Sequence, residues 1–455
     1  MDAFALAASI SSGTSSAVEA VTTSLSAIEA RDGKLNAFTV VLADEALQRA
    51  ADVDSGAVTG PLAGVPISVK DHVWVKGLLS TNGSRALETF VAPETCVAVQ
   101  RLLDAGAIIV GKTNNPEFCY RGHTANDLYG ATRNPHDPTR TAGGSSGGAA
   151  VSVATGAVPL AVGTDGGGSI RIPSAFCGTY GIKPSFGLVP KLPGFRGWPT
   201  LSVTGPIAAS VRDLALALQV MGGPAGADWL SFPTLGTPDY LAAVDAPTWR
   251  GLKVAVSEDL GFSDVDPDVR AAFRTAVDAA VAAGAELVES TPPADNPVPL
   301  WDAVALPEGY ASEGRLVEEQ RALVGDDAAA ITLAGRSASA LDYLDAQEDR
   351  AAYARRWSGF FADVDVLLTP ALPITAFALG RIGPETIDGA SVPDGFDAWC
   401  ALALPANLAG LPSACVPIGA DRNGLPIAAQ VMGGRWTDAV VLRGAALLDA
   451  AVRGS

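Results

Sequence analysis

Two glycine-rich turns enclose one apolar run: Gly143-Gly144-Ser145-Ser146-Gly147-Gly148 before it, and Gly163-Thr164-Asp165-Gly166-Gly167-Gly168-Ser169-Ile170-Arg171-Ile172-Pro173 at its end. The run from Ala149 to Val162 predicts a buried helix followed by a strand. Glycines let the backbone approach a ligand closely and adopt dihedral angles closed to other residues. If the second turn opens a helix, its unpaired N–H groups would face a developing negative charge. A serine there is a candidate nucleophile with an oxyanion hole beside it.

A lysine motif lies upstream, in the run Gly64-Val65-Pro66-Ile67-Ser68-Val69-Lys70-Asp71. The apolar residues Ile67–Val69 predict a short buried strand that delivers Lys70. A lysine acts as a base only where desolvation favours its neutral form, and this approach is apolar. The alternative is an ion pair of Lys70 with Asp71 or another carboxylate at the surface. Together with the serine turns, the catalytic interpretation is favoured.

These three motifs, in this order, resemble the amidase signature hydrolases. That family has a G-V-P-x-x-x-K-D run, a GGSSGG turn and a GTD-x-GGS-x-R-x-P turn, and Ser169 follows Ser145 by the family's 24 positions. The resemblance runs from about Gly64 to Leu448 and is loosest over 220–360. It implies an α/β fold whose core is a large mixed β-sheet flanked on both sides by helices.

The resemblance also implies a role for each motif residue. Ser169 is the nucleophile, and Ser145, entered through a cis Gly144–Ser145 peptide, relays the proton to Lys70, the general base. Backbone N–H groups would hold the oxyanion, from Gly166, Gly167, Gly168 and Ser169. Supporting roles fall to Gly144, Ser146, Asp165 and Arg171, with Ser146 donating a hydrogen bond and the last two holding the nucleophile turn.

Other catalytic chemistries find little support in the residues. The three histidines, His72, His123 and His136, leave a Ser–His–Asp triad open, although no G-x-S-x-G elbow is present. The P-loop pattern is absent, and no Cys/His set has zinc spacing. Cys177 is expected to be a packing thiol. We therefore predict no metal and no organic cofactor.

The amino-acid composition limits which kinds of partner are expected. The 455 residues carry a net charge of −18 without a basic run, so neither nucleic acid nor an anionic membrane is an expected partner. Five scattered cysteines do not indicate a disulfide framework, which favours a reducing cytoplasm. The uncharged runs Thr141–Thr164 and Cys400–Ala420 are interrupted by glycine and proline, which argues against membrane helices. A monomer or homodimer acting on a small molecule is expected.

The chain is expected to form a single amidase domain over 1–455. Its parts are an N-terminal helical wrap (1–58), a signature core (59–220), a variable substrate-pocket region (221–360) and a C-terminal core part (361–455). Helices are predicted at Ala17–Ile28, Ala43–Ala51, Thr95–Leu103 and Val269–Ala283, the last capped by Asp266. Strands at Ala107–Val110, Leu252–Val256 and Ala285–Val288 alternate with them, which indicates an α/β fold. Residues 290–360 read as helical.

The predicted activity is hydrolysis of small apolar or aryl amides, with ester and carbamate (urethane) cleavage through the same acyl-serine. The alternative is the glutamine amidase component of a tRNA-dependent amidotransferase, which typically reads K-P-T-Y-G-x-V-S-R-Y-G-L after the second turn. This chain departs from that pattern over Lys183–Gly194 and continues with an apolar loop. The candidate pocket residues are Phe195, Trp198, Trp301 and Tyr310. Trp198 could equally be a core residue.

Overall fold

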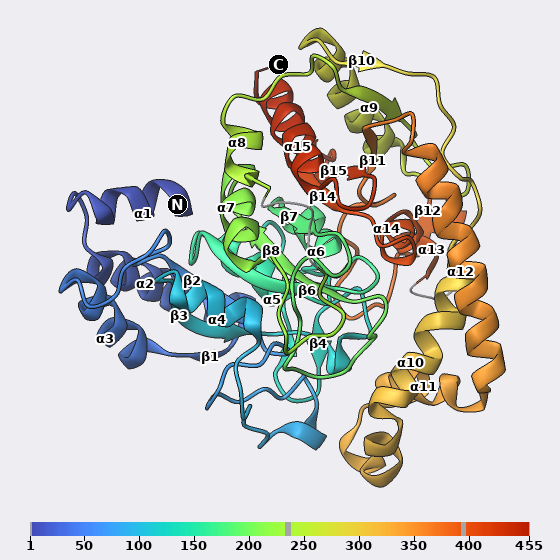
Figure 1. Ribbon diagram of the computed structural model, residues 1–455. Coiled ribbons are helices and arrows are strands. Elements are labelled where there is room, and N and C mark those ends of the chain that lie inside the picture. The colour runs from blue at the N-terminus through green and yellow to red at the C-terminus, as the bar shows by residue number, and fades with distance from the viewer. Residues whose placement is uncertain (1, 233–237, 393–396, 455) are drawn as a thin grey trace.

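One mixed β-sheet forms the centre of the structure, a computed structural model that describes residues 2–232, 238–392 and 397–454 (Figure 1). In spatial order its eleven strands are β1 (Phe38–Val41), β3 (Ile108–Thr113), β2 (Pro66–Lys70), β6 (Leu160–Asp165), β8 (Val203–Ala208), β7 (Tyr180–Lys183), β14 (Ser413–Ala420), β15 (Pro426–Gly433), β11 (Val366–Pro370), β9 (Lys253–Val256) and β10 (Glu286–Leu287). Strand β2 is parallel to β3 and β6, whereas β6, β8, β7, β14, β15 and β11 run antiparallel in succession. The predicted large mixed sheet is confirmed.

Helices cover both faces of this sheet. Every residue of β6 and of β15 is buried, which requires a covering layer on each side. The helices are α1 (Ala3–Ser11), α2 (Ala17–Leu35), α3 (Ala43–Asp54), α4 (Val97–Asp104), α5 (Gly147–Ala154), α6 (Arg171–Cys177), α7 (Val211–Met221), α8 (Tyr240–Asp245), α9 (Pro267–Ala282), α10 (Val298–Glu319), α11 (Asp326–Ala334), α12 (Ala340–Phe360), α13 (Asp397–Cys400), α14 (Leu404–Leu408) and α15 (Asp438–Arg453). Two small ribbons, β4 (Ala125–Asn126) with β5 (Gly130–Ala131) and β12 (Thr386–Ile387) with β13 (Ala390–Ser391), complete the fold.

The central stretch folds as its pattern predicts. The first glycine turn leads into α5, the apolar run continues into β6, and the second turn leads into α6. Helices α2 and α3 begin at the predicted residues and extend further, and β2 ends on Lys70. Neither uncharged run is a spanning helix; of the helices described, none is both long and apolar enough to cross a bilayer.

Two local predictions differ from the structure. The N-terminal segment is not only helical, because Phe38–Val41 adds the edge strand β1, antiparallel to β3. Asp266 is the N-cap residue of α9, as predicted, but its side chain makes no capping hydrogen bond; its carboxylate accepts the N–H of Asp388 instead.

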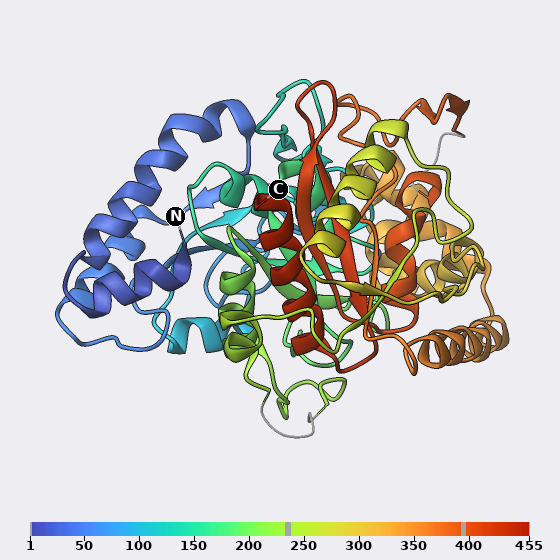
Figure 2. The same cartoon turned by 90° about the horizontal axis from the view of Figure 1, so that it is seen from above.

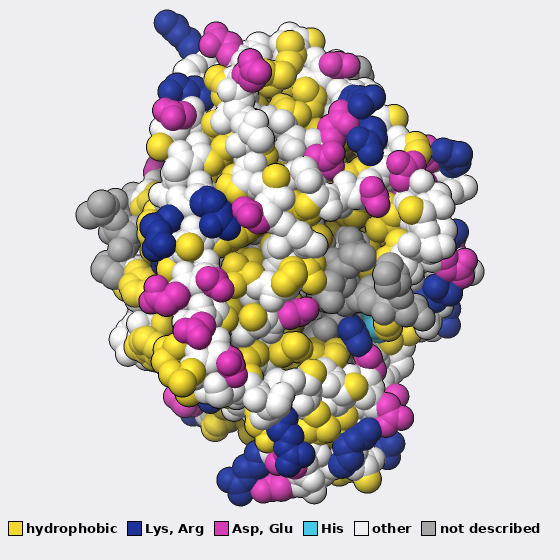
Figure 3. All heavy atoms as spheres, turned by 90° about the vertical axis from the view of Figure 1, so that its right-hand side faces the viewer, with side chains coloured by type: hydrophobic (Ala, Val, Ile, Leu, Met, Phe, Trp, Pro, Cys, Tyr) yellow, Lys and Arg dark blue, Asp and Glu magenta, His cyan; other side chains and the backbone are white. Residues whose placement is uncertain are grey.

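Residues 290–360 fold into α10, α11 and α12, which lie together on the right of Figure 1, at the opposite end from the N-terminal helices (Figure 2). Helix α10 turns one face inward, and Trp301, Ala305, Gly309 and Glu313 on that face are buried. Figure 3 views the molecule from this side, and basic and acidic side chains are interspersed on the face that it shows. The region thus supplies a wall for the interior site and a surface of mixed charge outside.

Candidate active site

Lys70 lies at the carboxyl end of β2, beside the carboxyl end of β6. Its Nζ is 2.7 Å from Oγ of Ser145 and 2.8 Å from Oγ1 of Thr164, and the side chain is fully buried. The fold therefore joins a lysine and a serine that are 75 positions apart in the chain. Thr164 was not singled out from the sequence. Its hydroxyl is the second acceptor of a hydrogen bond from Lys70.

Burial lowers the pKa of Lys70, while the Cys119 thiol and the Asp165 carboxylate oppose that shift. Cys119 was not predicted from the sequence. Its thiol lies close enough to Lys70 to interact with that charge and donates to Oδ1 of Asn82 at 3.5 Å. Phe118 and Cys119 both have positive φ angles, 54° and 64°. A lysine whose pKa is lowered by burial gives up its proton more readily than an exposed one, and in contact with a serine hydroxyl it can then act as a base.

Hydrogen bonds hold the first glycine turn against the second. The Gly144–Ser145 peptide is cis, as the resemblance implies, and a Cβ on Gly144 would lie 2.5 Å from the carbonyl oxygen of His123. The N–H of Ser146 donates to the carbonyl of Ser169 at 3.1 Å, and the Ser146 hydroxyl donates to the carbonyl of Thr164 at 3.2 Å. These bonds place Ser145 beside Ser169.

The N–H groups of the second turn are not equivalent. The N–H of Gly168 donates to Oδ1 of Asp165 at 2.8 Å, so this predicted oxyanion donor is already engaged. The N–H groups of Gly166, Gly167 and Ser169 have no acceptor in the described part of the chain, and the same is true of the Ser169 hydroxyl. The turn therefore offers a hydroxyl with three available N–H donors, one fewer than expected.

A buried ion pair holds the turn in this shape. Arg171 and Asp165 are both fully buried, with Nε 3.0 Å from Oδ2. The remaining donors of Arg171 reach three further acceptors: the carbonyl of Ala403 and the side chains of Asn407 and Gln430. Burial opposes ionisation of Asp165, yet the Arg171 guanidinium and its hydrogen bonds hold the pKa of that carboxyl well below its usual value.

The histidines do not supply a base. Burial and the nearby Lys70 charge lower the pKa of His72 to about 3, and its Nδ1 lies 2.9 Å from Oδ1 of Asn82. Burial lowers the pKa of His123 to about 4, and His136 Nε2 lies 3.0 Å from the carbonyl of Cys177. Within the described residues, none of the three bonds to Ser145 or Ser169, and no three His, Cys, Asp or Glu side chains are grouped to hold a metal ion.

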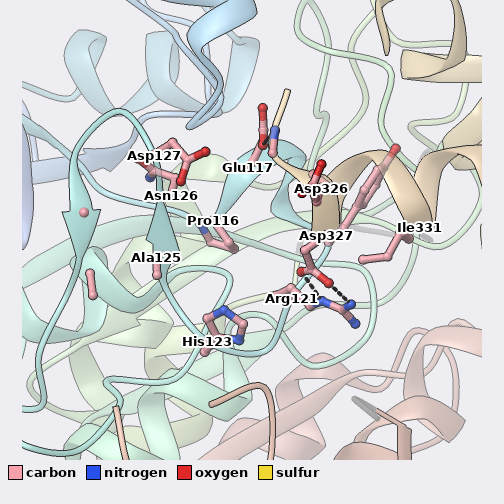
Figure 4. A pocket seen from close by; sticks show the side chains of 15 residues that line it. Pro116, Glu117, Arg121, His123, Ala125, Asn126, Asp127, Asp326, Asp327 and Ile331 are labelled. Atoms are coloured by element: carbon pink, nitrogen blue, oxygen red, sulfur yellow. Dashed lines mark hydrogen bonds and ion pairs between the residues drawn. The ribbon is translucent and has the colours of Figure 1, made fainter. Parts of the chain in front are cut away.

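Two adjoining cavities lie between the loop that follows β3 and helices α10 and α11. The inner cavity, of about 90 Å³, has aromatic walls formed by Tyr120, Trp198 and Trp301. The outer cavity, of about 410 Å³, is lined by charged as well as apolar side chains; Figure 4 shows His123 and the ion pair of Arg121 with Asp327 among them. Tyr120, Arg121 and Ile331 line both cavities, so the two lie side by side.

Two of the four predicted pocket residues share a cavity, and the other two lie elsewhere. Trp198 and Trp301 line the inner cavity although both are buried. Phe195 lines a small separate cavity beside Thr164 and packs on His72 with ring centroids 5.6 Å apart. Tyr310 lies outside these cavities, and its hydroxyl donates to Glu318 at 3.0 Å.

The fold and this site define a hydrolytic α/β enzyme. The chain belongs to the Amidase family, whose model matches residues 19–442. It is 37% identical to an acylamidase of Rhodococcus erythropolis, over 99% of this chain and 95% of the relative. It is 34% identical to a glutamyl-tRNA(Gln) amidotransferase component of Koribacter versatilis, over 91% of each chain. A bacterial aryl acylamidase of the amidase signature family superposes with a TM-score of 0.90, at 31% identity, over 99% of this chain and 96% of that one. The chain is therefore an amide-cleaving hydrolase.

Proposed function

We propose that the chain hydrolyses small apolar or aryl amides through an acyl-enzyme on Ser169. The observation that carries the proposal is the 2.7 Å contact of buried Lys70 with Ser145, beside a turn with three available N–H donors. Lys70 takes the Ser145 proton as Ser145 takes that of Ser169, and Ser169 Oγ attacks the carbonyl carbon. The N–H groups of Gly166, Gly167 and Ser169 receive the developing oxyanion.

The same relay then runs in reverse. Lys70, through Ser145, returns the proton to the leaving nitrogen as the C–N bond breaks, and water attacks the acyl-serine with the relay again as base. Esters and carbamates pass through equivalent acyl- or carbamoyl-serine adducts, so the proposal includes both as further substrates. It needs no metal and no organic cofactor.

The neighbours of the two glycine turns support an assignment of the two halves of the substrate. Trp301 lies against the oxyanion turn, since a Cβ on Gly167 would lie 3.1 Å from its ring. The backbone of His123 instead lies against Gly144. Gly144 precedes Ser145, the residue that protonates the leaving nitrogen in this proposal. We assign the small aromatic cavity to the acyl group and the larger outer cavity to the amine.

A substrate panel tests this assignment. An acetyl anilide should exceed glutamine in kcat/KM by about 10²-fold or more, because a site with aromatic walls leaves the polar groups of glutamine unpaired. Enlarging the acyl group should reduce kcat/KM more steeply than enlarging the amine. Steady-state kinetics on acyl anilides, an aryl carbamate and glutamine measure both trends.

The amidotransferase alternative rests on relatives such as the Koribacter versatilis protein. It predicts the opposite order, with glutamine the best substrate, above all in the presence of partner proteins of such a complex. That result would replace the present proposal.

A further inference from the structure

The peptide between Gly166 and Gly167 is held from outside the turn by a tryptophan. Nε1 of Trp301, on α10, donates to the carbonyl oxygen of Gly166 at 3.1 Å, and Trp301 is buried. A peptide group is planar, so the Gly166 carbonyl and the Gly167 N–H share one plane and point in opposite directions. Fixing the carbonyl therefore fixes the direction of the Gly167 N–H.

That N–H is one of the three available donors of the turn. The neighbouring Gly168 N–H is held by Asp165, but the Gly167 N–H has no acceptor in the described residues. A hydrogen bond accepted by the carbonyl also polarises the amide and strengthens its N–H as a donor. The indole thus acts on the direction and on the strength of this donor.

The rings around the turn leave the peptide little freedom. A Cβ on Gly166 would lie 2.5 Å from Cε3 of Trp198, so only glycine fits beneath that ring. Trp198 packs edge-on against Trp301, with centroids 4.9 Å apart, and stacks on Tyr120 at 5.1 Å. The Tyr120 hydroxyl donates to buried Glu313, which like Trp301 belongs to α10. One helix therefore anchors both ends of the aromatic stack.

We propose that Trp301 is a positioning residue of the oxyanion hole: its indole N–H aligns the Gly166–Gly167 peptide so that the Gly167 N–H meets the oxyanion. This inference rests on the proposed function, because it presumes nucleophilic attack by Ser169. It adds a residue of the variable helical region, distant from the three motifs in the sequence, to the groups that support the reaction.

Trp301→Phe keeps a ring and removes the N–H. We expect kcat to fall roughly 10- to 100-fold, below the loss of about 10²–10³ seen when an oxyanion donor is removed outright. KM should change less than about threefold, since ground-state binding does not use the hydrogen bond. The rate of covalent modification by an aryl phosphonate, which forms an anionic tetrahedral adduct, should fall by the same factor as kcat/KM.

Trp357→Phe is the matched control. Trp357, on α12, is fully buried, and its indole N–H makes no hydrogen bond among the described residues. This variant loses a buried indole without losing a hydrogen bond, so its kcat should equal that of the wild type. If Trp301→Phe does not fold, 3-benzothienylalanine at position 301 keeps the shape, lacks the N–H and should give the same loss of kcat.

The outcomes separate the two proposals. Wild-type kcat in either Trp301 variant, with Ser169 still modified at the wild-type rate, overturns the role of Trp301 and leaves the proposed function intact. A change confined to KM, with kcat unaltered, would also overturn it. Absence of phosphonate on Ser169 in the wild type would instead refute the proposed function itself.

Discussion

Lys70→Ala and Ser145→Ala should each lower kcat by about 10²- to 10⁴-fold, the range expected when general-base catalysis is lost. The double variant should be little worse than the poorer single variant, because the two residues form one proton path through a 2.7 Å contact. Losses that multiply in the double variant would show that the two side chains act separately. Pre-steady-state acylation rates on an acyl anilide measure the effect directly.

The pH profile gives this prediction a second readout. Lys70 acts as a base only when neutral, so the acylation rate should rise with pH and level off above the pKa of Lys70. Burial lowers that pKa, so the rising limb should lie below the ordinary lysine value of about 10.4. In Lys70→Ala the limb should vanish.

Lys112 provides the matched control. It is also fully buried, on the neighbouring strand β3, and its Nζ donates to the carbonyls of Asp71 and Leu79 and to the Ser80 hydroxyl. Lys112→Met should lower stability but keep the alkaline limb. Loss of the limb in that variant would mean that the limb does not report on Lys70.

Arg171→Met should lower the free energy of unfolding by about 3–5 kcal/mol, the cost of leaving one member of a buried ion pair without its partner. Asp165 would then be a buried carboxylate without its ion-pair partner, still required to hold the N–H of Gly168. The exposed pair Arg315 with Glu319 on α10 is the control, and Arg315→Met should cost less than about 1 kcal/mol. Urea unfolding, followed by fluorescence, measures both.

A double variant sharpens this test. Asp165→Asn combined with Arg171→Met removes both charges and should be more stable than Arg171→Met alone. A double variant as unstable as the sum of the two singles would show that the pair does not act as a unit.

The motif residues could be placed from the sequence because their neighbours are local. Glycine spacing marks the two turns, and an apolar run ending on Lys70 marks a strand that delivers it to the sheet edge. Thr164 lies within the second motif, yet its role depends on a partner from another strand. The position of the Cys119 side chain depends on positive φ angles at Phe118 and Cys119, and neither residue type predicts such an angle from the sequence. The pairing of Gly168 with Asp165 likewise arises from how the turn closes.

In helix α10 the prediction grouped two aromatic residues that lie on different faces of the helix. Trp301, Ala305, Gly309 and Glu313 recur every four residues and form the buried face. Tyr310 is nine residues from Trp301, about two and a half helical turns, and therefore lies on the opposite face. The period of the helix could have separated these two aromatics. Edge strand β1 was harder to predict, because four residues between two helices are too few to show an alternating apolar pattern.

The site of the covalent intermediate tests the central claim most directly. Wild-type protein is incubated with a slowly released aryl carbamate, quenched in acid, and analysed by intact mass and peptide mapping. We predict one carbamoyl group per chain, on Ser169, and none in Ser169→Ala. A stoichiometric adduct on Ser145, Cys119 or any other side chain, or full turnover by Ser169→Ala, would contradict the account.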